Sequence, residues 1–425
     1  MAEPGDDAQD RPVFGKITDY DIERLRSEVG VPRHGRTTRH DPKPTEAGIS
    51  HFAFSYGDDN PLWHDPAYGS LTRWGATIAP PTYMSITGRC DIPKPPKHTR
   101  TEPAPLKGCG EYASGLSWEW FRPVYAGDEI WYEPSICGVE VKEESRFAGG
   151  RTVVRTSREH YVDRAGQTIS SHENTFVIAE RGGSQNKNEH RDVVAATYTD
   201  EEIAEIDALY AAEAPRGAEP RWFEDVEVGE RLQPLAKGPL TVTDIIAEHL
   251  GRGMGHYGHG PLKYWWLGRQ RMAGFYTNNS QGIPDVVQRL HWEDERAQEI
   301  GLPLAYDYGD MRVNWLCHLV TNWMGDDAWL WKLSCNIRRF NFLGDWHKME
   351  GKVTAKRMEA GRPVVDLELT GTSQRGWVTC SGQATVVLPS TGHGPVRLPD
   401  PPRPLSERAA AAAVERSARR RAATP

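Results

Sequence analysis

Residues 118–142 read WEWFRPVYAGDEIWYEPSICGVEVK, and residues 337–356 repeat the pattern as IRRFNFLGDWHKMEGKVTAK. Gly127-Asp128 of the first segment corresponds to Gly344-Asp345 of the second, 217 residues further along the chain. The runs that follow these segments match at offsets of 210 and 211 residues. A nearly constant offset over about 60 residues indicates an internal duplication.

Each copy carries the pattern of an antiparallel meander. Three runs rich in β-branched and aromatic residues are separated by Gly-Asp, Gly-Arg or Arg-x-Gly turns. Turns of this kind join neighbouring antiparallel strands, so the pattern predicts a meander of three strands in each copy.

Helical patterns precede the strands of each copy. One helix is expected over residues 45–56 and its counterpart over 243–250, because polar N-cap residues open both segments. A second helix per copy is expected to begin near Pro81 and after Gly309. In the latter, four apolar residues fall at the spacing of one helix face; they are Val313, Leu316, Cys317 and Val320.

The duplication predicts two folded units in one chain of 425 residues. We expect an N-terminal domain at residues 15–182 and a C-terminal domain at 221–392. The polar segment 183–220 is expected to link them and to carry a short helix over TDEEIAEIDALYAAEA. The ends, residues 1–14 and 393–425, are rich in proline, alanine and charge and are expected to lack fixed structure.

The composition excludes several classes of function. The net charge of −8 and the scattered basic residues argue against nucleic acid as a partner. No apolar run is long enough to span a membrane, and the acidic start of the chain does not resemble a signal peptide. Six cysteines lie far apart without a CxxC pair, which is typical of reduced thiols. We therefore expect a cytoplasmic protein.

The loop GDDNPLWHD at residues 57–65 carries a family resemblance. It is similar to the loop Gly-Asp-x-Asn-Pro-Ile/Leu-His-x-Asp of the MaoC-like hydratase/dehydratase family, and residues 121–124 with Gly127-Asp128 match a later strand of that family. The chain also resembles the dehydratase region of type I fatty-acid synthases. The resemblance implies an α+β fold of two tandem hot-dog domains, each with a long central helix wrapped by an antiparallel sheet, forming a double hot-dog.

The resemblance also implies a chemistry. Members of the family add or remove water at the 2,3 double bond beside an acyl thioester, on coenzyme A or on an acyl carrier protein. An aspartate and a histidine hold the water and move its protons. Backbone N–H groups at the start of the central helix stabilise the charge on the thioester oxygen. The reaction implies no metal and no other cofactor, and the expected assembly is a homodimer or a hetero-oligomer with another hot-dog protein.

The first copy departs from the family loop at its histidine. Trp63 occupies the histidine slot, and His64 stands one place later. One interpretation is that the first copy has lost its activity and leaves Asp58 without a partner. The other is that a one-residue bulge lets Asp58 and His64 act together. Asn60 and Trp63 are expected to contact substrate in either case.

The second copy retains the end of the loop as LHWEDERA at residues 290–297. His291 falls in the family's catalytic slot, and Glu293 replaces the aspartate two residues later. Counting from Thr243-Asp244 places Gly255-His256 opposite Gly57-Asp58, which implies an insertion of 30 residues. The nearest acid before His291 is Asp285, six residues upstream.

Asp285 and His291 are therefore the predicted catalytic pair. Glu293, Tyr308 and Gly309 are expected to contact substrate, with backbone near Gly309 forming the oxyanion site. In the alternative interpretation His291 has only a structural role, as a buried imidazole that hydrogen-bonds to the backbone. His256 and His259 could hold a metal, although a flexible glycine-rich loop explains them better.

Two other functions fit the same sequence. A hot-dog thioesterase would hydrolyse acyl-CoA instead of hydrating it. A non-catalytic subunit would bind acyl-CoA or complete the tunnel of another hot-dog chain, and the imperfect loops of both copies favour this alternative. Basic residues of the insertion could hold the phosphates of coenzyme A or simply face solvent; they are Lys263, Arg269 and Arg271.

Overall fold

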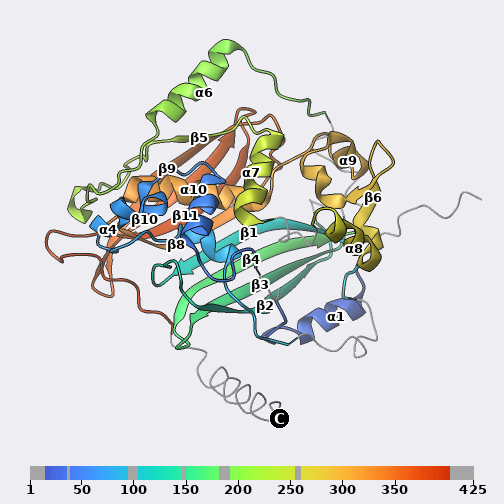
Figure 1. Cartoon of the computed structure of the whole chain (residues 1–425), viewed down its shortest axis with the longest axis horizontal. Coiled ribbons are helices and arrows are strands. Elements are labelled where there is room, and N and C mark those ends of the chain that lie inside the picture. The colour runs from blue at the N-terminus through green and yellow to red at the C-terminus, as the bar shows by residue number, and fades with distance from the viewer. Residues whose placement is uncertain are drawn as a thin grey trace, which may run out of the picture.

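A computed structural model describes residues 15–35, 39–93, 104–145, 150–180, 192–253 and 260–402 (Figure 1). One antiparallel sheet runs through both halves in the order β2-β3-β4-β1-β8-β11-β10-β9-β5. In the first half its strands are β1 (Gly110–Trp120), β2 (Ile130–Lys142), β3 (Thr152–Asp163) and β4 (Thr168–Ala179). In the second half they are β5 (Leu235–Lys237), β8 (Trp329–Ile337), β9 (His347–Glu359), β10 (Arg362–Ser373) and β11 (Val378–Val387).

The two copies join through equivalent strands. β1 pairs antiparallel with β8, and Ser117 lies opposite Ser334. These two serines are separated by the same 217 residues that separate Gly127 from Gly344. Four strands of each copy are thus related by an approximate twofold axis, and the second copy adds β5 at its edge. The predicted meanders are confirmed as β2-β3-β4 and β9-β10-β11.

The second copy contains the predicted central helix. This helix, α10 (Gly309–Met324), lies against β8, β9, β10 and β11 (Figure 1), and every residue from Met311 to Met324 is buried. Its polar side chains therefore need partners inside the protein. Arg312, for example, forms a two-pronged ion pair with Asp307 at 2.6 and 2.8 Å and also donates to the carbonyl oxygen of Thr379.

The first copy differs from the prediction of a long central helix. At Pro81 the described chain forms only a short 3₁₀ helix, η1 (Pro81–Ile86). Paired prolines suit only the start of a helix, and Thr87 is already extended with φ −113° and ψ 167°. The sheet of the first copy is therefore less filled on its inner face than that of the second.

The helices before each central segment are related by the duplication. α2 (Glu46–Phe54) begins after Thr45, and α7 (Val242–Arg252) begins after Thr241, two residues before the predicted start. Gly57 and Gly253, each twelve residues after its threonine, both have a positive φ, 72° and 77°. Gly253, not Gly255, is therefore the structural counterpart of Gly57, and the residues expected opposite Asp58 lie outside the described part of the chain.

The remaining elements are short and surround this frame. The predicted linker helix is present as α6 (Asp200–Ala212), which begins at Thr199 with a capping box and lies at the periphery in Figure 1. The insertion forms α8, η6, β6, β7 and η7, which are grouped with the following α9 at one corner of the molecule. The bounds of the other elements are α1 (Asp19–Ser27), α3 (Pro61–His64), α4 (Pro66–Leu71), η4 (Phe223–Asp225), α8 (Lys263–Arg271), η6 (Ala273–Phe275), β6 (Tyr276–Asn278), β7 (Pro284–Val286), η7 (Val287–His291) and α9 (Asp294–Glu299).

Membrane-spanning helices, disulfides and domain boundaries were also considered in the sequence. Within the described ranges, no helix is both long and apolar enough to cross a membrane. All six cysteines carry free thiols. The predicted domain boundaries stay a prediction, because the sheet continues without a break from one copy to the other.

Candidate active site

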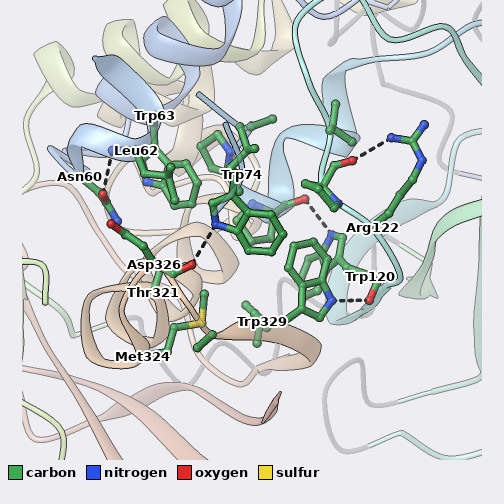
Figure 2. Close-up of a pocket in the computed structure, with 18 of the residues that line it drawn as sticks. Asn60, Leu62, Trp63, Trp74, Trp120, Arg122, Thr321, Met324, Asp326 and Trp329 are labelled. Atoms are coloured by element: carbon green, nitrogen blue, oxygen red, sulfur yellow. Dashed lines mark hydrogen bonds between the residues drawn. The ribbon is translucent and has the colours of Figure 1, made fainter. Parts of the chain in front are cut away.

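The first-copy loop places an indole in the histidine slot. Asn60 begins α3 by accepting a hydrogen bond from the Leu62 amide at 3.0 Å. The following Trp63 is only 3% exposed and lines a small pocket with Trp74 and the end of α10 (Figure 2). The volume of this pocket, about 30 Å³, holds little more than a water molecule. An imidazole in this slot would face a mainly apolar wall.

His64 does not pair with the carboxylate of Asp58. Its Nε2 donates to the backbone carbonyl oxygen of Asp58 at 2.7 Å. Since that nitrogen must carry the proton, Nδ1 accepts the hydrogen bond from the Ser50 hydroxyl at 2.8 Å. Both ring nitrogens thus stabilise the loop, and the Asp58 carboxylate turns elsewhere.

The Asp58 carboxylate belongs to a buried polar cluster. Oδ1 accepts from the Asn60 amide at 3.1 Å and lies 3.7 Å from Nε2 of His318 on α10. Oδ2 accepts from the Tyr56 hydroxyl at 3.3 Å. Asp58 is 2% exposed and His318 fully buried, so this cluster offers a substrate no surface.

The same cluster joins the linker and β5 to α10. His318 Nδ1 lies 2.8 Å from Lys237 Nζ, and its Nε2 lies 3.0 Å from Glu213 Oε1, just after α6. Burial lowers the pKa of Lys237, against the negative charges of Glu213 and Asp58. Although burial opposes it, the hydrogen bond with His318 lowers the pKa of Glu213. The sequence did not predict that these residues contact one another, because they are far apart in the chain.

The predicted pair of the second copy is separated in the structure. Asp285 lies in the β6–β7 hairpin, where Oδ1 accepts from the Val286 amide at 2.7 Å. His291 ends η7, and its Nδ1 donates to the carbonyl oxygen of Tyr306 at 2.7 Å. Among the described residues, no hydrogen bond or ion pair joins Asp285 to His291.

His291 instead lies against the start of α10. Its ring centroid is 3.8 Å from that of Tyr308, the N-cap residue of this helix. The hydrogen bond to Tyr306 places the proton on Nδ1 and leaves Nε2 as the basic nitrogen. Burial lowers the pKa of His291 to about 3, helped by nearby His249, so the imidazole is neutral at pH 7. His249 Nε2 lies 3.1 Å from the Tyr308 hydroxyl.

The start of α10 packs closely against β8. A Cβ on Gly309 would lie 2.6 Å from Ile337 Cδ1, so glycine lets the helix begin tightly against β8. No side chain caps this helix start. Its first N–H groups and the helix dipole therefore provide a site for developing negative charge.

A cavity of about 580 Å³ adjoins the first turns of α10. Asp310, Val313 and Asn314 line it on one side, and the inner face of the first-copy sheet lines it on the other. The short η1 helix of the first copy contributes Thr82, Ser85 and Ile86 to its wall. The volume is in the range of pockets that take a substrate-sized molecule.

An acid with a shifted pKa, Glu248, is buried next to a residue that lines this cavity. Arg252, which lines the cavity, places Nε 3.2 Å from Glu248 Oε1 and Nη2 2.7 Å from Asp310 Oδ2. Burial raises the pKa of Glu248 to about 7, although Arg252 opposes the shift. Sequence reasoning missed this group, and the i,i+4 pair of Glu248 and Arg252 on a predicted helix was its available signal.

The other residues predicted to bind substrate have structural partners. Glu293 is the N-cap residue of α9, and its carboxylate lies 2.8 Å from Nε of buried Arg289. In α8, the Arg269 guanidinium stacks over Trp265 at 3.8 Å. His256 and His259, the alternative metal ligands, lie outside the described residues.

Comparisons with known proteins address the fold. Residues 36–172 match a family model described as the FAS1-like dehydratase domain region. A solved structure described as a MaoC-like dehydratase aligns with a TM-score of 0.57 and 16% identity, covering 86% of this chain and 100% of that one. A MaoC domain protein dehydratase from Chloroflexus aurantiacus J-10-fl aligns with a TM-score of 0.48 and 13% identity, covering 86% and 96%. A Mycobacterium tuberculosis protein described as having a double hot-dog fold aligns with a TM-score of 0.46 and 9% identity, covering 84% and 96%.

No curated protein matches the chain. The likeness to the MaoC-like dehydratase structure confirms the predicted double hot-dog fold. The family match confirms the predicted resemblance to a fatty-acid synthase dehydratase region, over residues 36–172 of the first copy.

Proposed function

We propose that the protein is an acyl-thioester hydratase or dehydratase, which adds or removes water at the 2,3 position of an acyl group on coenzyme A or on a carrier protein. One observation carries the proposal. The 580 Å³ cavity adjoins the uncapped start of α10, and His291, with its proton fixed on Nδ1, lies against the N-cap residue of that helix.

In this mechanism the second copy performs the chemistry. During hydration, Nε2 of His291 takes a proton from water as the oxygen bonds to carbon 3 of the enoyl thioester. The thioester oxygen gains negative charge, which the N–H groups at Gly309 and Asp310 stabilise. A second group then supplies a proton to carbon 2, which restores the thioester. Dehydration follows the same steps in reverse.

Two acids compete for the second role. Asp285 is the acid nearest before His291 in the sequence, but its Oδ1 is engaged by the Val286 amide. Glu248 has no exposed surface and lies behind Arg252, which lines the cavity, and its pKa of about 7 is close to the operating pH that favours proton transfer. Its pKa favours Glu248 for the acid, and this role requires that Arg252 move aside so that the buried carboxyl group reaches the substrate.

The test is an assay of 2-enoyl-CoA hydration by loss of enone absorbance, run beside an assay for free thiol. We expect enone loss without thiol release, and thiol release instead would indicate a thioesterase. His291→Ala and Glu248→Gln should each remove hydration, and loss in Asp285→Asn alone would return the second role to Asp285. Loss only on changing Asp58 or His64 would move the site to the first copy.

A second candidate is a non-catalytic subunit that binds acyl-CoA within a larger hot-dog assembly. The filled histidine slot at Trp63 and the separation of Asp285 from His291 favour it. Hydration by the isolated chain would exclude an obligate partner. Activity that is present only after co-purification with another hot-dog protein would support this second candidate.

A further inference from the structure

The inner face of the first-copy sheet carries polar side chains among its aromatic ones. Residues on this face form three rows across the four strands, because each pairs with its neighbour in register, and the cavity is lined mainly by members of the last two rows. The rows are Trp120, Ser170, Tyr161 and Tyr132; Trp118, His172, Glu159 and Pro134; and Leu116, Asn174, Ser157 and Ile136. A sheet face turned inward is normally apolar, so the acid, histidine and amide of the last two rows need an explanation.

The middle row is organised around His172. Its ring stacks on Trp118 at 4.0 Å and 11°, and its Nδ1 lies 3.7 Å from Glu159 Oε2. Glu159 accepts from Arg39 at 2.5 Å and from the Tyr161 hydroxyl at 2.6 Å. Although burial opposes it, Arg39 holds the pKa of Glu159 well below its usual range.

An ionised Glu159 favours the proton of His172 on Nδ1. The Nε2 atom is then a hydrogen-bond acceptor, and it has no partner within the described part of the chain. The His172 side chain is only 9% exposed, which makes an unsatisfied nitrogen costly. One row further on, Oδ1 of Asn174 is also a buried acceptor without a partner among the described residues.

The charges at the cavity wall exclude one class of ligand. Arg39 is matched by Glu159 at 2.5 Å, and Arg252 is matched by Asp310 at 2.7 Å. Neither guanidinium is left to balance a further carboxylate. The group that reaches this wall is therefore neutral, and the aromatic neighbours of His172 favour a flat ring.

We propose that this cavity binds the distal part of the acyl group and selects a neutral ring that carries a hydroxyl. The ring lies among Trp118, Tyr132 and Phe176, and its hydroxyl donates to Nε2 of His172 beside Asn174. This inference rests on the proposed function, because the cavity adjoins the helix start that would hold the thioester.

The test measures equilibrium binding of two saturated thioesters, which cannot be hydrated. The probes are phenylpropanoyl-CoA and its para-hydroxylated counterpart. Wild-type protein should bind the hydroxylated thioester about tenfold more tightly, the scale of one neutral hydrogen bond, because a hydroxyl has a single proton to donate. His172→Phe, which keeps a ring on Trp118, and Asn174→Leu should each reduce that preference. Glu173→Gln, on the outer face of the same strand, should keep it.

Equal binding of the two thioesters by wild-type protein, or no binding of either, would overturn the inference. So would an unchanged preference in both folded variants, as checked by circular dichroism. The enone assay is independent of these measurements. If the hydroxylated thioester binds more tightly but no enone is hydrated, the proposed function is wrong and the inference about the ring is supported. If enone is hydrated but the two thioesters bind equally, the inference is wrong and the proposed function is supported.

Discussion

Ser55 and Gly251 meet at the crossing of α2 and α7, and each stands ten residues after the threonine that begins its helix. A Cβ built on Gly251 would lie 2.3 Å from Ser55 Oγ and 2.4 Å from its Cβ. The two copies of the duplication therefore touch at equivalent positions here, as they do at Ser117 and Ser334 in the sheet. The duplicated halves pack as one unit around a shared axis.

Gly251→Ala is expected to destabilise the protein by about 1–3 kcal/mol, because the added methyl group overlaps Ser55 and must push the helices apart. Urea denaturation measures the loss. The double variant Ser55→Gly with Gly251→Ala should recover part of it. A double variant that is as unstable as the sum of the two single changes would contradict the contact.

Trp63→Ala is expected to lower the free energy of unfolding by about 3–5 kcal/mol, because it empties a buried site between the first-copy loop and α10. Trp266, which is 48% exposed on α8, is the matched control. Trp266→Ala should change stability by less than about 0.5 kcal/mol. Equal effects of the two changes would show that Trp63 does not pack as described.

Lys237→Met is expected to cost about 3–5 kcal/mol, because it leaves Asp58 and Glu213 buried without their cation. Adding Glu213→Gln should restore part of the stability, since it removes one of the unpaired charges. Lys332→Met, which breaks a 3.6 Å surface pair with Glu119, should have an effect below about 1 kcal/mol. Thermal denaturation of the four proteins decides the outcome.

Glu248 should make stability fall as pH rises. Its ordinary pKa is 4.5 and its folded pKa about 7, so the folded state holds the extra proton between these values. The free energy of unfolding should therefore decrease from pH 4.5 to pH 7, by on the order of 3 kcal/mol from this group. Glu248→Gln should flatten this part of the profile. A profile that keeps its slope in the variant would refute the assignment.

His291→Ala is expected to reduce hydration by about 10²-fold, the lower end of the usual contribution of a general base, because its pKa of about 3 lies well below the operating pH. His34 is the matched control, because its Nδ1 also contacts a backbone carbonyl, that of Ile92 at 2.8 Å. His34→Ala should leave the rate close to wild type. A rate that is insensitive to His291 would exclude it as the base.

Much of the fold could be predicted from local pattern. The constant offset predicted the duplication and its meanders, and polar caps with apolar spacing predicted α2, α6, α7 and α10. The start of α7 was placed two residues late, because Thr243 has the same character as Thr241. The spacing T-x-x-D from Thr241 to Asp244, which forms the observed capping box, was the signal that separates them.

The candidate site was less predictable. The family slot identified His291, but its neighbours at the helix start, His249 and Tyr308, come from segments 42 and 17 residues away. The shortened first-copy helix follows from Pro80 and Pro81, whereas the cavity beside it depends on how both copies pack. The family resemblance identified which loop positions correspond to catalytic ones, but it did not predict which side chains surround them.

The sequence alone determined the repeated strands, the central helix of the second copy and the indole in the first-copy loop. These features depend on residue type and short spacing. Only the tertiary structure decided that Asp58 meets His318, that His291 meets Tyr308, and that His172 meets Glu159 across two strands. The physical reason is that such contacts join side chains on different elements, and their geometry is set by strand register and by the packing of the whole sheet and its helices.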